Sequence, residues 1–370
     1  MIDFLNTHAE QIVLTVVVIL AIFSLIVFVG AIYSRWMLQL AEKRKKKIRE
    51  DLSEVVIMYT LGELSLSDLK KNLSTKTDYS ILLQISNELD KTLEGDEEVR
   101  LKRIMNLPEI REYFIGRFNS KNPLEQAKAC LYFSRKTEIK ERFLPKIYSH
   151  TKSEHPMLAY AACMAIISHG SADQKKDAIR NLLSNDGLSN QALNDVFSEF
   201  QLKSSDDRVE ESKLLMQLID ERNYNVERTA LMIRTLGELG FYESAEFLLN
   251  EFMEIPSEDY SPAIVVALID VLALFGMEEI LEKLYSEFIS SQYSEVREAI
   301  AKALGVFGKT ESIPFLKWLL VDPDFYVRFH SAKSLSMYPN IDLRKLSVPN
   351  IGNEEFDELV GEIESLTVEG

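Results

Sequence analysis

DPDFYVRFHSAKSLSMY, residues 322–338, repeats a pattern that stands earlier in the chain as QYSEVREAIAKALGVFG, residues 292–308. Five identities recur at one constant offset: Val296, Arg297, Ala301, Lys302 and Leu304 return as Val327, Arg328, Ala332, Lys333 and Leu335. Self-similarity at a fixed period, here about 31 residues, is the signature of a repeat architecture. The chain is therefore predicted to be an array of helical units.

Apolar residues in the first of these copies fall on one stripe of a helix. They follow the spacing i, i+3, i+4, i+7, i+8 and i+11, as Val296, Ala299, Ile300, Ala303, Leu304 and Phe307. Equivalent stripes begin at or near positions 124, 158, 188, 226, 264 and 327, a spacing of about 30 to 38 residues. A single helix pair cannot bury such faces, so neighbouring pairs must stack.

The run SIPFLKWLLVDPDFYVRFHSAKSL, residues 312–335, resembles a HEAT repeat. It has a first helix with Pro near its start, a turn containing Asp, and a second helix reading V-R-x-x-x-A-x-x-L. The resemblance implies an all-α, HEAT-like α-solenoid of about six to seven helix pairs that binds other macromolecules. It also implies a stabilising ladder between turn carboxylates and arginines, here Asp322 or Asp324 with Arg328 and Arg297.

An uncharged run, residues 12–33, precedes the array. As a helix it is about 33 Å long, enough to cross a hydrocarbon core of about 30 Å. Basic residues follow it and none precede it: Arg35, Lys43, Arg44, Lys45, Lys46, Lys47 and Arg49. By the positive-inside rule this predicts a single pass through the inner membrane, with residues 1–11 outside and the rest in the cytoplasm. The basic residues also suit a membrane surface, and Gly30 with Ser34 leaves a homodimer open.

The rest of the chain divides by composition. Residues 34–61 are predicted to form a basic juxtamembrane stalk, and residues 62–118 a helical adaptor without the repeat pattern. The array then occupies residues 119–340. Residues 341–370 form an acidic segment with one apolar face, suited to capping the end of the stack.

Charge and motifs exclude several function classes. Residues 51–370 hold 35 Lys and Arg against 54 Asp and Glu, a net charge of −19 that repels nucleic acid. The two cysteines, Cys130 and Cys163, are predicted to be core residues. No phosphate-binding loop, zinc motif or nucleophile motif is present. We therefore predict no enzyme activity, no cofactor and no metal. The alternative is a repeat-based lyase or hydrolase with a site at His150, Glu154 and His155.

A surface for a protein partner is the remaining candidate. Side chains beside the buried stripes are more apolar near the membrane end, which gives the candidate contacts Phe133, Tyr160, Met164, Ile167 and Phe329. Packing between repeats explains the same residues, and the sequence leaves both interpretations open. The predicted function is a membrane-tethered cytoplasmic scaffold or regulator, a subunit of a membrane-associated assembly such as an envelope polysaccharide or secretion system.

Overall fold

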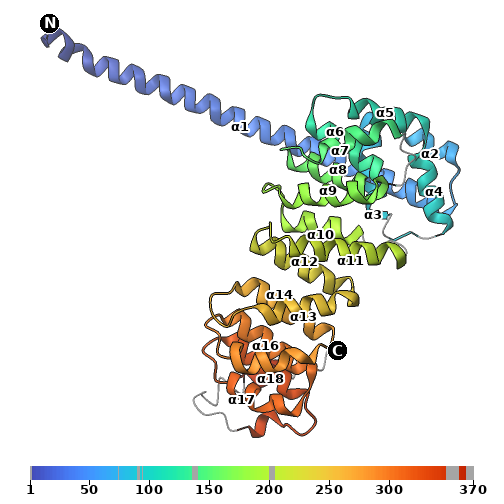
Figure 1. The fold of residues 1–370 in the computed structure, drawn as a ribbon. Coiled ribbons are helices and arrows are strands. Elements are labelled where there is room, and N and C mark those ends of the chain that lie inside the picture. The colour runs from blue at the N-terminus through green and yellow to red at the C-terminus, as the bar shows by residue number, and fades with distance from the viewer. Residues whose placement is uncertain are drawn as a thin grey trace. The chain divides into compact units, whose positions relative to one another are not determined.

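The structure is a computed structural model that describes residues 2–73, 75–89, 92–93, 95–135, 141–199, 205–346 and 358–363. Its chain forms two compact units, Met1–Ile139 and Lys140–Gly370 (Figure 1). Every regular element among the described residues is helical. The predicted all-α class is therefore confirmed.

The first unit begins with one continuous helix, α1, Ile2–Leu61. It is the one helix in the described part of the chain that is long and apolar enough to cross a membrane, with a mean hydropathy of 2.7 over its most apolar window. The C-terminal part of α1 is different, because Leu52, Val56 and Tyr59 are buried. There α1 packs on α2, α3 and α4. The apolar segment and the folded unit thus share one helix.

Five shorter helices complete the first unit. They are α2 Leu66–Asn72, α3 Lys76–Leu89, α4 Asp96–Met105, α5 Pro108–Phe118 and α6 Pro123–Ser134. The last two begin with Pro at the first helical turn, where its missing N–H costs nothing. The rings of Phe114 and Tyr132 stack at 4.4 Å, and the Tyr132 hydroxyl donates to the Met105 carbonyl at 2.8 Å. These contacts place α6 in the first unit, whereas the predicted array begins at residue 119.

The second unit consists of paired helices. Its elements are η1 Glu141–Phe143, α7 Leu144–His150, α8 Pro156–His169, α9 Ala172–Leu183, α10 Asn190–Ser198, α11 Ser205–Asp220, α12 Val226–Glu238, η3 Tyr242–Ser244, α13 Ala245–Glu254, α14 Pro262–Leu274, η4 Glu278–Ile280, α15 Leu281–Lys283, η5 Leu284–Phe288, α16 Ser294–Phe307, η6 Thr310–Ser312, α17 Ile313–Leu319, α18 Phe325–Ser336 and η7 Leu343–Lys345. Residues 358–363 are also helical, and Leu359, Val360 and Ile363 are buried there. The starts of α12 and α14 give the repeat register between residues 188 and 262, which the sequence leaves unclear.

The second helices of successive pairs stack in one row. α10 packs on α12, α12 on α14, α14 on α16 and α16 on α18, and each of α11, α13 and α17 packs on its own partner (Figure 1). The predicted stripe is the buried face of α16, with Val296 and Leu304 fully buried and Phe307 half-buried. This is the predicted α-solenoid, in which each repeat buries its neighbour.

Small residues bring two of these helix pairs into close contact. A Cβ atom added at Gly237 of α12 would lie 2.7 Å from Val271 of α14. One at Gly305 of α16 would overlap the Ser334 hydroxyl of α18, which donates to the Ala301 carbonyl at 2.7 Å. Both glycines lie near the C-terminal ends of their helices, and at these two places the neighbouring helix leaves no room for a Cβ atom.

An ion-pair ladder joins the last two repeats. The Arg297 guanidinium donates from Nε to Asp322 Oδ2 at 2.6 Å and from Nη2 to Oδ1 at 2.9 Å. Its Nη1 donates to the Ser291 carbonyl at 2.6 Å. Asp324 caps α18, and Arg328 donates to the carbonyls of Asp322 and Pro323. The Asp322 carboxylate also holds Arg297 protonated by raising its pKa.

Candidate partner-binding surface

A row of exposed apolar side chains lies on the last three repeats of the array. It consists of Leu274, Val306 and Met337, which are 60%, 65% and 60% exposed. They occupy equivalent places at the C-terminal ends of α14, α16 and α18. Exposed apolar residues that occur singly are ordinary, but these three recur at equivalent positions of successive repeats, so one partner could contact all of them. We call these three residues the apolar row.

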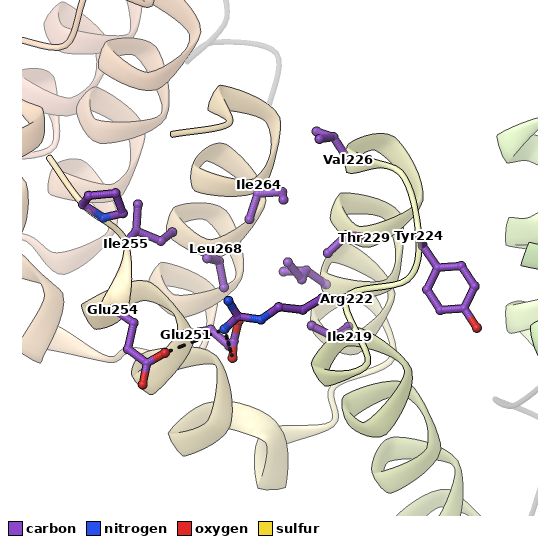
Figure 2. A pocket seen from close by; sticks show the side chains of 12 residues that line it. Ile219, Arg222, Tyr224, Val226, Thr229, Glu251, Glu254, Ile255, Ile264 and Leu268 are labelled. Carbon is purple, nitrogen blue, oxygen red and sulfur yellow. Dashed lines mark ion pairs between the residues drawn. The ribbon is translucent and has the colours of Figure 1, made fainter. Parts of the chain in front are cut away.

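A cavity of about 300 Å³ lies between two repeats of the same unit. Its walls come from the first and middle turns of α12 and α14, as Val226, Thr229, Ile233, Ile264 and Leu268, together with Ile219, Ile255 and Pro256. Figure 2 shows Ile264 and Leu268 on one side and Val226 and Thr229 on the other. Ile264 belongs to the predicted buried stripe, yet it is only half-buried because it faces this space. We call it the α12–α14 cavity.

Three charged side chains stand at the edge of the cavity. Arg222 follows the end of α11, and its Nη2 lies 3.5 Å from Glu251 Oε1 and 3.7 Å from Glu254 Oε2, both on α13 (Figure 2). These separations exceed the 2.7–3.2 Å of a hydrogen bond. The Arg222 side chain is 68% exposed, and its backbone adopts a positive φ of 49°. One cation therefore faces two carboxylates without a close hydrogen bond to either, and of the two Glu254 is exposed and Glu251 half-buried.

The predicted partner contacts are placed differently from the apolar row. Phe133, Met164 and Ile167 are buried, with exposed fractions of 3%, 5% and 1%. The sequence leaves two interpretations open for these three residues, a partner surface or packing between helices. Because the three side chains are buried, packing accounts for them and their assignment to a partner surface is corrected. Tyr160 and Phe329 are half-buried. The Phe329 ring lies 5.2 Å from His330 and 6.2 Å from Phe325.

The predicted membrane-surface residues all lie on α1. Arg35, Lys43, Arg44, Lys45, Lys46, Lys47 and Arg49 are exposed. Two of them contact acidic side chains: Lys46 lies 3.9 Å from Glu50, and Arg49 binds both oxygens of Glu88 on α3, at 2.5 and 2.7 Å. Arg49 therefore helps to fasten α1 to the first unit.

The residues of the alternative enzymatic site lie where α7 ends and α8 begins. His150 is the last residue of α7, and its pKa is lowered by burial and by Lys146. His155 is the N-cap residue of α8, and Glu154 beside it is exposed. Both cysteines are buried, and burial raises the pKa of the Cys163 thiol. Within the ranges that the structure describes, no three His, Cys, Asp or Glu side chains are placed to hold a metal ion.

Comparison with known families matches the model of HEAT repeats to residues 281–346. The match spans α15, α16, α17 and α18, the elements that contain the Arg297–Asp322 ladder. Residues 281–346 therefore match HEAT repeats, as the sequence resemblance predicts. Comparison with curated proteins gives no match. The HEAT-repeat region also carries Val306 and Met337 of the apolar row, and Leu274 lies before it.

Sequence reasoning missed both the apolar row and the charged edge of the cavity. A sequence pattern could have identified the apolar row, because Leu274, Val306 and Met337 recur at nearly the period that relates Val296 to Val327. No sequence pattern points to the charged edge formed by Arg222, Glu251 and Glu254. Their positions fall at the ends of two successive first helices, and only the stacking of those helices brings the charges together.

Proposed function

We propose that this protein is a membrane-tethered cytoplasmic scaffold or regulator that binds a protein partner through the apolar row of its HEAT repeats. The observation that carries the proposal is the row itself, three exposed apolar side chains at equivalent positions in successive repeats. Burying each of them against a partner removes apolar surface from water, at about 25 cal/mol per Å². Helical repeats commonly serve as extended binding surfaces of this kind.

The tether rests on α1. Residues 22–33 are exposed throughout in the structure, as a segment that lies in lipid would be. We infer that α1 is not a cleaved signal sequence, because cleavage would cut a helix that continues unbroken to Leu61, where it packs on the rest of the first unit. The basic residues that follow support an orientation with the repeats in the cytoplasm. We therefore propose a single-pass inner-membrane protein that acts within a membrane-associated assembly, with no catalytic activity of its own.

Co-purification from solubilised membranes tests the proposal directly. The full chain is compared with Leu274→Glu and Val306→Glu, since a charge placed in a desolvated contact has no counterion. Val99→Glu is the matched control, because Val99 on α4 is 61% exposed and lies outside the row. We expect both row variants to lose a protein that the control retains, with unchanged thermal melting. Row variants that fold and keep every co-purifying protein would overturn the proposal.

A further inference from the structure

The α12–α14 cavity has the properties of a binding pocket for one large apolar side chain. Its volume of about 300 Å³ stands at the lower end of the range of ligand pockets. The walls are predominantly aliphatic, and the two helices that form them pack directly on one another in the array. A bulky aliphatic or aromatic side chain fits such a space and would bury most of its surface there.

The edge of the cavity selects for positive charge. Glu251 and Glu254 together carry two negative charges, and Arg222 supplies one positive charge at 3.5 and 3.7 Å. The Arg222 and Glu254 side chains are 68% and 73% exposed, and ion pairs between exposed groups contribute little to stability, whereas Glu251 is 23% exposed. Arg222 is therefore easily displaced by another cation that approaches the same carboxylates, and its present position marks where that cation would bind.

We propose that the α12–α14 cavity binds a segment of a protein partner in which a bulky apolar side chain stands close to a Lys or Arg. The apolar side chain enters the cavity, and the basic residue replaces Arg222 on Glu251 and Glu254. This proposal rests on the proposed scaffold function and specifies the chemistry of the partner.

Charge complementarity favours this occupant over others. The chain carries a net charge of −16, so anionic lipid headgroups and phosphorylated ligands are repelled from the array. A neutral apolar ligand would fill the cavity but leave the two carboxylates unused. Large anchor side chains in a pocket, surrounded by polar contacts at the rim, are the usual source of affinity in protein interfaces.

Selection of random peptides on the detergent-solubilised full chain tests the proposal. The same selection is run on Thr229→Trp, in which an indole from α12 fills the cavity, and on Ile264→Trp should the first variant melt early. We expect peptides enriched only on the unmodified chain to combine Leu, Phe or Trp with a nearby Lys or Arg. Enrichment of acidic peptides, or no difference between the unmodified chain and a folded filled variant, would overturn the proposal.

Affinity measurements on a selected peptide test the displacement step. The double change Glu251→Gln and Glu254→Gln should weaken binding by about tenfold, since each lost contact is charge-assisted. Arg222→Asn removes the competing cation and keeps a residue that tolerates positive φ, so binding should tighten by up to about fivefold. Lys317→Asn on α17 makes the same charge change at another exposed site and should change nothing. Weaker binding by Arg222→Asn would refute displacement.

The two proposals fail separately. Leu274→Glu and Val306→Glu lie outside the lining of the cavity, so peptide affinity should be unchanged in both variants. If cavity variants bind like the unmodified chain while row variants lose the membrane partner, the scaffold remains and the cavity proposal is wrong. If row variants keep the partner and cavity variants lose it, binding lies at the cavity instead.

Discussion

Asp322→Ala should loosen the last two repeats without unfolding the remainder of the chain. The Arg297 and Asp322 side chains are 11% and 4% exposed and meet through two parallel hydrogen bonds. Removing the carboxylate leaves a buried guanidinium that keeps its bond to the Ser291 carbonyl but has lost its counterion. Breaking a buried pair by deleting one partner costs about 3–5 kcal/mol. Because about 1.4 kcal/mol corresponds to a tenfold change in an equilibrium constant, local opening should become about 10²-fold to about 4,000-fold more frequent.

Hydrogen exchange measured by mass spectrometry on the full chain in detergent resolves this effect by segment. Protection should fall in residues 294–336 and remain unchanged in α8 and α9, because repeat arrays are stabilised by nearest-neighbour contacts. Asp324→Ala serves as the control, since it removes the cap of α18 and a nearby charge but leaves the Arg297–Asp322 hydrogen bonds in place, and it should cost about 1 kcal/mol.

The double variant Arg297→Met with Asp322→Ala completes the test. It removes both charges, so the cost should be well below that of Asp322→Ala alone. An equal loss of protection in the double variant and the single variant would refute the assignment of the cost to an unpaired buried charge. Uniform loss across the second unit would refute the local character of the repeat.

Gly305→Ala should destabilise the array by about 1–3 kcal/mol, because the new methyl group meets α18. Gly116→Ala on α5 is the control, since its methyl group meets nothing within 4 Å and should stabilise the chain by up to about 1 kcal/mol. Chemical denaturation measures the free energy of unfolding of both variants. Leu304→Asp should unfold the end of the array, since Leu304 is fully buried, while Lys302→Asp should leave the melting temperature nearly unchanged. Burial and the charge of Lys302 lower the pKa of His330 below its ordinary value of 6.5, and Glu298 opposes this shift only in part. The folded chain therefore binds a proton at His330 less readily than the unfolded chain does. Exchange protection of α18 should therefore decrease as the pH falls from about 8 to about 5, and less so in His330→Gln.

The period of the sequence predicted the architecture because successive helix pairs must stack to bury Val296 and Leu304. The resemblance to HEAT repeats likewise anticipated that Arg297 and Asp322 belong to one ladder. The helical period of the sequence identifies the buried stripe, but it does not show which residues beside the stripe stay exposed. Phe133 and Met164 lie on such flanks, and neighbouring helices cover them in the structure. Whether a neighbour covers a given flank depends on how closely two helices approach, and a single helix pattern holds no information on that distance.

The cavity lies away from the closest contact that Gly237 makes between α12 and α14. Gly237 allows the two helices to meet at their C-terminal halves, where a Cβ atom would lie 2.7 Å from Val271. Val226, Thr229 and Ile264, nearer the N-terminal ends of the two helices, line the cavity together with Ile233 and Leu268 at their middles. The pocket of about 300 Å³ opens to solvent beside Arg222 and Val226, so its aliphatic walls remain accessible to a partner side chain. A partner side chain that fills it would complete the packing of the array, and its binding would stabilise the second unit by mass action.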